Sequence, residues 1–283
     1  MKNLFLYFLP FFLIYSNLSF SQLEGQDYLN WAWGGKYSPY IEGTLGYGIL
    51  NHSVLVGSFS NISTAELKLG YTELKNYKEY VQSLDERYLF TSYNSSNFLQ
   101  FKDYKPGDIN STMWRFGIGN RLGFGYKIDA FSLIPYHQLQ IVWTNVEWDS
   151  VSSNLSNEDL NILIRYPGGV RFGSSTEAGF KFYIAKTISI YAGLEASLIF
   201  QRHKVLHWSA NYMLQAISYG AVSFFAETIV NSSPFFGPIM YFVLKNAIGF
   251  AWYYAMSDEM YWPISSETPL TMQTVKLGAS FTF

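Results

Sequence analysis

The sequence contains no cysteine and few charged residues. None of its 283 residues is a cysteine, so disulfides are excluded and backbone pairing and burial must hold the fold together. Charged residues make up 14% of the chain, against about 25% in a typical soluble domain. A net charge of −2 gives no general attraction to nucleic acid, which is therefore not an expected partner.

Aromatic residues and glycine, by contrast, are abundant. Phe, Trp and Tyr make up 19% of the chain, and 22 residues are glycine. The mean hydropathy is nevertheless close to zero, which argues against a bundle of membrane-spanning helices. Few charges, many aromatics and moderate hydropathy together favour a membrane β-barrel.

The first 21 residues have the pattern of a cleaved signal peptide. A short basic opening precedes an apolar run at 4–15, and small residues stand at Ser19 and Ser21. The apolar run is too short to span a membrane as a helix. We therefore predict a signal peptide over residues 1–21 and a mature chain over 22–283.

Residues 114–128 alternate between two kinds of side chain with a period of two. Arg115 and Arg121 share one face with glycines, whereas bulky apolar residues share the other, which only Asn120 interrupts. A helix would spread the arginines through the apolar surface, so the pattern predicts a strand. Residues 275–283 alternate in the same way. Such a strand has one side suited to lipid and one suited to a polar lumen.

Eight segments of this kind predict an antiparallel up-and-down β-barrel. The predicted strands span residues 40–47, 65–72, 87–94, 114–128, 133–148, 170–185, 188–201 and 275–283. Short connections are expected at 129–130 and 186–187, and long ones at 50–62, 95–111 and 149–169. Membrane barrels have this alternation, with short turns at one end and long loops at the other.

Residues 203–269 do not fit the strand pattern. Apolar residues recur there at helical spacing, which predicts a helical hairpin at about 208–257, with Ser209 as the N-cap and Pro234 opening the second helix. The alternative is a barrel of ten strands, with the two further strands at 205–217 and 239–256. We favour the hairpin. We expect it at the long-loop end, where it caps the barrel mouth or lies against the outer leaflet.

Many charged residues fall on the predicted inward face. They are Glu42, Glu66, Lys68, Arg115, Arg121, Lys127, Arg171, Glu177, Lys181, Glu195 and Lys276. The interior of an eight-stranded barrel is just wide enough for side chains to fill it, and unpaired buried charges are unfavourable. We therefore predict a charge network that fills the lumen. The alternative is a selective conduit with a basic bias.

With these features the chain resembles the Gram-negative outer-membrane β-barrel superfamily. The resemblance depends on the predicted signal peptide that ends at Ser21, on the alternating strands, and on the C-terminal residues Phe281-Thr282-Phe283. It implies a place in the outer membrane, in contact with lipid and lipopolysaccharide. It also implies that the barrel-assembly machinery recognises Phe283. The resemblance does not identify a subfamily.

The basic residues Arg202 and Lys204 follow the seventh predicted strand. Arg and Lys pair well with phosphate, so this rim is expected to contact lipopolysaccharide phosphates. The alternative is an ordinary solvated loop. His203 and His207 have the spacing of two metal ligands on a helix, but no acidic third ligand is near, so no metal is predicted. The sequence contains no cofactor motif either.

Three functions are compatible with such a barrel. The leading hypothesis is a structural or binding role without chemistry, and the second is a narrow channel or carrier for small or apolar molecules. The third is a lipid A-modifying enzyme, which needs a nucleophile beside a base. His52 and Ser53 are adjacent in sequence and rarely face each other in that arrangement, and His137 is predicted to point outward. The histidine-x-serine pattern of the deacylases is absent there.

Overall fold

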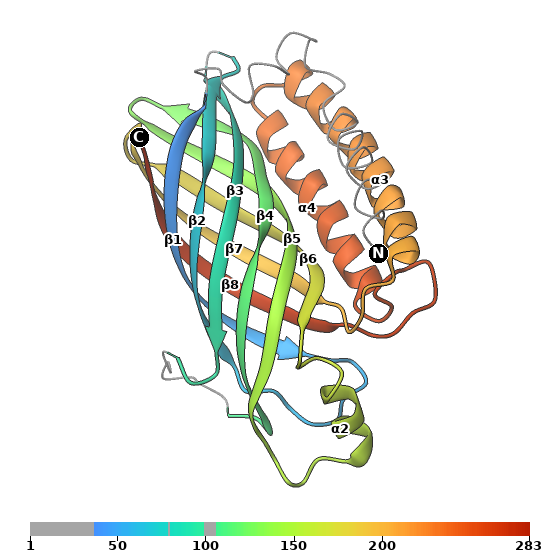
Figure 1. Ribbon diagram of the computed structural model, residues 1–283. Helices are drawn as coiled ribbons and strands as arrows, with labels where there is room; N and C mark the ends of the chain where they lie inside the picture. Colours follow the sequence, from blue (N-terminus) through green and yellow to red (C-terminus); the bar gives the residue numbers. More distant parts are fainter. Residues whose placement is uncertain (1–36, 79, 99–105) are drawn as a thin grey trace, which may run out of the picture.

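Eight antiparallel strands form a closed barrel in the computed structural model, which describes residues 37–283 apart from 79 and 99–105 (Figure 1). Each strand pairs with its neighbours in chain order, and the last closes against the first. The elements are β1 (Ser38–Asn51), β2 (Ile62–Asn76), β3 (Val81–Ser95), β4 (Ile109–Ile128), β5 (Phe131–Val151), α2 (Asn157–Leu163), β6 (Val170–Tyr183), β7 (Ile188–Ile199), α3 (Val205–Ser232), α4 (Gly237–Met256) and β8 (Leu270–Thr282). The eight-stranded prediction is confirmed, and the ten-stranded alternative is wrong. The predicted signal peptide lies outside the described residues.

The two ends of the barrel differ as the connection lengths predicted. The turn between β4 and β5 is only two residues long, and Asp129 adopts a positive φ of 52° in it. The C-terminus lies at the same end as this turn, and the connection that carries α2 lies at the other (Figure 1). We call these the short-turn end and the long-loop end.

Charged residues face the lumen and apolar residues face outward. On β4, the inward Arg115 and Arg121 are fully buried, whereas the outward Trp114 and Phe116 are about half exposed, at 55% and 48%. Outward side chains on other strands are similarly exposed and apolar: Leu45, Leu69, Leu89, Leu194, Val275 and Leu277. A soluble barrel would have apolar residues inside and polar residues outside. The opposite arrangement seen here is typical of a barrel wall surrounded by lipid.

The region predicted as a helical hairpin forms α3 and α4. Their starts differ from the prediction. Lys204 is the N-cap of α3, and Ser209 lies inside the helix, where its hydroxyl donates to the Val205 carbonyl. The second helix starts at Gly237 with Pro238 in its first turn, so Pro234 belongs to the hairpin connection. Proline in the first turn has no helical N–H bond to lose, and Pro238 satisfies this preference better than Pro234.

The hairpin lies beside the barrel and does not cap its mouth (Figure 1). α4 packs on the outer surface of β4 to β7, and α3 packs on α4. The hairpin tip reaches the short-turn end, where Tyr77 Oη is 2.5 Å from Asn231 Oδ1 and the Tyr126 hydroxyl donates to the Phe235 carbonyl at 2.5 Å. Within the described residues, α3 is the single helix long and apolar enough to cross a membrane. At about 1.5 Å per residue, its 28 residues extend over about 42 Å.

Candidate functional site

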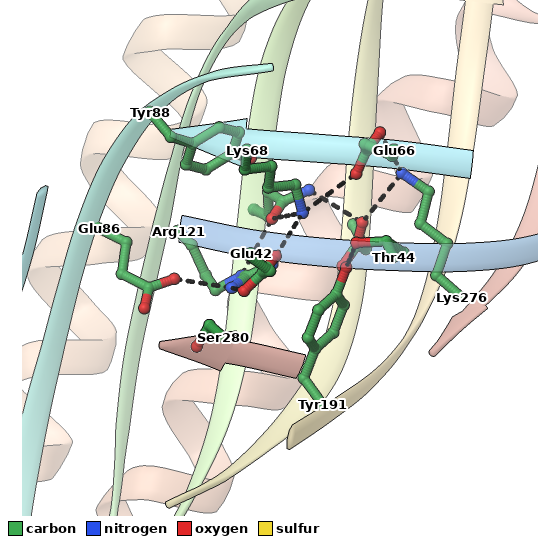
Figure 2. A network of polar contacts seen from close by, with 12 residues as sticks. Glu42, Thr44, Glu66, Lys68, Glu86, Tyr88, Arg121, Tyr191, Lys276 and Ser280 are labelled. Carbon is green, nitrogen blue, oxygen red and sulfur yellow. Dashed lines mark hydrogen bonds and ion pairs between the residues drawn. The ribbon is translucent and has the colours of Figure 1, made fainter. Parts of the chain in front are cut away.

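Arg121 is the centre of an ion-pair cluster in the lumen. Its Nη1 lies 2.8 Å from Glu42 Oε2 and 2.7 Å from Glu86 Oε2. Lys181 Nζ lies 3.2 Å from the Glu42 carboxylate and 2.5 Å from that of Glu86. All four side chains are at most 1% exposed, and they come from four different strands. Figure 2 shows Arg121 between Glu42 and Glu86.

Two lysines extend this cluster along the lumen. Lys68 Nζ lies 3.0 Å from Glu42 Oε1 and 3.3 Å from Glu66 Oε1, so it links these carboxylates. Lys276 Nζ lies 2.9 Å from Glu66 Oε2 (Figure 2). Lys276 also pairs with Glu195. The network therefore connects four neighbouring strands, β7, β8, β1 and β2, on one side of the barrel.

Further partners complete the network on the opposite side. Arg115 Nη2 lies 2.8 Å from Glu195 Oε1. Glu177 accepts a hydrogen bond from the Tyr136 hydroxyl at 2.5 Å and another from Gln138 at 2.9 Å. Each of these groups is buried, so the hydrogen bonds replace the water that the charged groups lose.

The buried charges of the lumen cancel. The carboxylates are Glu42, Glu66, Glu86, Glu177 and Glu195, and the cations are Lys68, Arg115, Arg121, Lys181 and Lys276. Five of each give a net charge of zero, so the described lumen lacks the basic bias that belonged to the alternative of a selective conduit. Glu86 was absent from the predicted network because the predicted third strand began one residue after it.

Tyrosine rings occupy much of the remaining space around the network. The Arg121 guanidinium carbon lies 4.5 Å from the Tyr136 ring centroid and 4.7 Å from that of Tyr191. Lys68 Nζ lies 5.1 Å from the rings of Tyr88 and Tyr191. Sequence reasoning missed these tyrosines because it assigned bulky residues to the outer face.

Two predicted lumen residues lie elsewhere. Arg171 is the second residue of β6, at the long-loop end, where its guanidinium donates to the carbonyls of Tyr166, Pro167 and Gln201 at 2.7 to 2.9 Å. It holds the loop that follows α2. Lys127 lies near the short-turn end of β4 and is exposed. Both residues occupy positions that alternate toward the lumen, but they lie beyond the enclosed part of the barrel.

The two basic residues of the rim share one carboxylate. Arg202 pairs with Glu267, and Lys204 Nζ lies 3.2 Å from Glu267 Oε2. A single excess positive charge therefore remains at this position, where phosphate contact stays a prediction. His203 stacks on Phe172 with ring centroids 4.5 Å apart, and burial lowers the pKa of His203.

The candidate nucleophile and base of the first loop do not face each other. The His52 side chain is buried, whereas Ser53 is exposed. His52 lies against Gln201, with 3.4 Å between the two Nε2 atoms, and burial lowers the pKa of His52. This histidine therefore packs inside the long-loop end.

A polar seam joins α4 to the outer wall of the barrel. His137 points outward, as predicted, and its Nδ1 lies 3.0 Å from Asn246 Oδ1. Asn246 Nδ2 also donates to the Tyr136 carbonyl at 3.3 Å. A Cβ at Gly249 would lie 2.6 Å from Thr176 Oγ1, so only glycine permits this close approach. The seam fixes the helix to the barrel by hydrogen bonds and by shape.

The two helices are joined by a second polar contact. Lys245 is only 4% exposed, and its Nζ donates to Ser223 Oγ at 2.7 Å. The same ammonium lies 5.4 Å from the Tyr219 ring centroid, and Trp252 Nε1 donates to Ser218 Oγ at 2.7 Å. These contacts hold α3 and α4 together as one hairpin.

A groove with a volume of about 1630 Å³ lies between the hairpin and the wall and extends over the outer face of β3 and β2 to β1. Its floor consists of outward side chains of the barrel, including Leu89, Ile118 and Ile141. Its roof is one side of α3 and α4, including Tyr219 and Trp252. This groove was not predicted because the hairpin was expected to cap the barrel mouth or to lie against the outer leaflet, although Asn120, which interrupts the apolar face of β4, lines the groove.

Neither a protein-family model nor a curated protein matches the chain. Similar solved structures include Neisserial surface protein A, with a TM-score of 0.37, 8% identity, and coverage of 88% of this chain and 100% of that one. Ail, the attachment invasion locus protein of Yersinia pestis, has a TM-score of 0.33 and 8% identity over 88% and 99% of the two chains. The outer membrane protein OprG from Pseudomonas aeruginosa has a TM-score of 0.28 and 8% identity over 88% and 97%.

These three are small outer-membrane β-barrel proteins of Gram-negative bacteria. The chain has the same general fold, an up-and-down antiparallel barrel, as its own strand order establishes. The likeness concerns the fold alone.

Proposed function

We propose that the chain is an integral outer-membrane barrel with a closed lumen and a binding role on its outer wall. The apolar, exposed outward side chains support a membrane location, because such a surface is unfavourable in water. Phe283 is 70% exposed at the short-turn end, where the barrel-assembly machinery would recognise it. In this orientation the short-turn end is periplasmic and the long-loop end faces outward.

The observation that carries the closed lumen is the neutral network of five carboxylates and five cations. Breaking a buried ion pair leaves an uncompensated charge, which costs about 3–5 kcal/mol. Opening a path through the centre would separate Arg121 from Glu42 and Glu86 together. The network therefore favours a filled barrel over a narrow channel.

The groove supports binding as the second part of the proposal. Ligand sites are concave, mostly apolar and provided with a few polar groups. The groove combines an apolar floor with polar side chains such as Asn120 and Gln215. Because it opens beside the barrel, its ligand enters from the membrane and does not cross the lumen.

Single-channel recording in planar bilayers tests the closed lumen. We expect no stable open steps from purified protein whose folding is verified by its heat-modifiable mobility on a gel. A large porin recorded in the same bilayers controls for insertion. Stable steps from the folded protein would contradict the proposal and favour the channel hypothesis.

A further inference from the structure

The groove between the hairpin and the barrel wall has a charged end and an aromatic end. The charged residues that line it lie in the half nearer the short-turn end: Glu73, Lys75, Asp85, Arg87 and Glu227. The long-loop half, called the aromatic end here, has no charged residue in its described lining and contains Phe172, Phe200, Trp208, Tyr212, Trp252 and Met256 beside the uncharged polar Asn211 and Gln215. Aromatic residues such as Tyr71 and Phe124 also line the charged half. Such a division matches a molecule with a polar head and a long apolar tail.

We propose that this groove binds one zwitterionic phospholipid of the periplasmic leaflet, with its headgroup at the charged end and its acyl chains along the barrel wall. This inference rests on the proposed membrane orientation. In that orientation the short-turn end is periplasmic, so the charged end of the groove lies at the depth of the headgroups of that leaflet. The aromatic end then lies beyond the midplane, where acyl chains extend.

The charges at the headgroup end are of both signs. Arg87 Nη2 lies 3.1 Å from Asp85 Oδ2, and both side chains are about a quarter exposed. Lys75 Nζ lies 2.9 Å from Glu73 Oε2, and Lys75 is 45% exposed. A zwitterionic headgroup offers a phosphate to the two cations and an ammonium to the carboxylates. With Glu227 the carboxylates outnumber the cations by three to two, which disfavours a purely anionic headgroup.

The size of the groove favours a two-chain lipid. Its volume of about 1630 Å³ exceeds the roughly 300–1,000 Å³ typical of pockets for drug-sized ligands. Lipopolysaccharide is disfavoured because its phosphates lie in the outer leaflet, beside the aromatic end of the groove.

α3 turns a polar stripe toward the groove. Polar residues recur along it at every fourth position: Asn211, Gln215, Tyr219, Ser223, Glu227 and Asn231. Neighbouring residues at this spacing lie one turn apart on the helix surface, so the stripe winds gradually around α3. Five of the six line the groove, and the sixth, Ser223, accepts the hydrogen bond from Lys245. Elsewhere the helix exposes large apolar side chains: Leu206, Met213, Ile217, Phe224 and Phe225.

The test compares two tryptophan substitutions on α3. Ala216 lines the groove, whereas Ala221 is exposed and does not line it. Ala216→Trp fills the groove, and Ala221→Trp adds the same side chain on the lipid side. Purified full-length protein in detergent is incubated with phosphatidylethanolamine, phosphatidylglycerol or lipid A, and native mass spectrometry counts the retained lipids.

We expect the wild type and Ala221→Trp to retain one phosphatidylethanolamine, and Ala216→Trp to bind it about tenfold more weakly, because overpacking leaves no room for the chains. Should Ala216→Trp fail to fold, Ser174→Phe narrows the groove from the barrel wall and serves in its place. Equal retention by all variants, or no retention by the wild type, would overturn the site. Equal or tighter binding of phosphatidylglycerol or lipid A would overturn the headgroup assignment. A conducting protein that still retains phosphatidylethanolamine would refute the closed lumen and leave this inference standing.

Discussion

The barrel has a bare wall and a covered wall, and their outward residues differ in kind. On β1 and in the middle of β8, Leu45, Val275 and Leu277 are 54% to 63% exposed and wholly apolar, whereas Gln273, nearer the start of β8, donates to the Tyr253 hydroxyl of α4 at 3.2 Å. On β4, β5 and β6, which α4 contacts, Asn120, His137 and Thr176 occupy outward positions. Outward polar residues therefore accompany the helical hairpin.

The difference follows from the cost of a polar group in hydrocarbon. Leu45, Val275 and Leu277 are more than half exposed in the described chain, so an amide or an imidazole at these positions would face lipid. On the covered wall Asn246 pairs with His137, and Gly249 brings the helix into direct contact with Thr176. The pair of His137 and Asn246 follows the rule that polar groups inside a membrane are retained where a neighbouring element satisfies them, whereas Thr176 Oγ1 has no hydrogen-bond partner among the described residues.

The largest expected effect comes from placing a charge on the bare wall. Leu277→Lys exposes an ammonium to lipid near the middle of β8, and such a change costs about 2–4 kcal/mol at the bilayer midplane. Asn120→Lys places the same group in the groove, where polar neighbours reduce the cost. Equilibrium urea unfolding in lipid vesicles measures both. Equal losses of stability on the two walls would remove the distinction between them.

A smaller effect is expected from pushing the hairpin off the covered wall. A Cβ at Gly249 would lie 2.8 Å from His137 Cε1, so Gly249→Leu overpacks the seam and costs about 1–3 kcal/mol. Gly220→Leu on α3 is the matched control, since a Cβ there has nothing within 4 Å. Thermal unfolding in detergent and protease cleavage of the hairpin report the change. Similar behaviour of the two leucine variants would show that α4 does not lie against β5.

Removing the seam's hydrogen bond is expected to cost less. His137→Leu leaves Asn246 Oδ1 without its donor, and polar contacts between membrane segments average about 0.6 kcal/mol, with about 1.7 as the upper value. The double variant with Asn246→Leu removes both partners and should recover part of the loss. Urea unfolding of the four proteins in a double-mutant cycle gives the coupling. A coupling of zero would mean that the two side chains do not meet.

The smallest effect concerns the long-loop end, which belongs to neither wall. Burial lowers the pKa of His52 from its ordinary value of 6.5. The unfolded chain therefore takes up this proton at a higher pH than the folded chain, and stability declines as the pH falls below about 6.5. His52→Gln should flatten this part of the curve of unfolding free energy against pH. An unchanged slope would assign the acid sensitivity to other groups.

The strands were predictable because the side chains of each strand alternate between those suited to lipid and those suited to the polar lumen. On β4 the alternation of arginine with bulky apolar residues requires no knowledge of the partner strands. Glu86 was missed because Tyr88 and Phe90 put large rings on the inward face of β3, which hides the alternation. Arg171 was wrongly assigned to the lumen because the alternation along a strand gives the direction of a side chain but not its depth along the barrel.

The position of the hairpin was not predictable from its own sequence. Large apolar residues lie on several sides of α3, so its periodicity does not define one face that must be buried. The relevant signal is on the barrel: Asn120 and His137 interrupt outward apolar faces. Recognising these interruptions as one covered surface requires the register between strands, which pairs Asn120 with Leu139 and His137 with Leu122.

Disulfide trapping between Gly249→Cys and Thr176→Cys tests most directly that the hairpin lies against the outer wall of the barrel. The chain has no cysteine of its own, so no background bridge forms. A Cβ at Gly249 would lie 2.6 Å from Thr176 Oγ1, the atom bonded to the Thr176 Cβ. The two Cβ atoms are therefore close enough for a disulfide, in which they are roughly 3.5–4.5 Å apart. We predict that this pair crosslinks in intact cells, and that Gly249→Cys with Leu277→Cys, on the bare wall, does not. Absence of the first crosslink in folded protein, or equal yields from both pairs, would contradict the account.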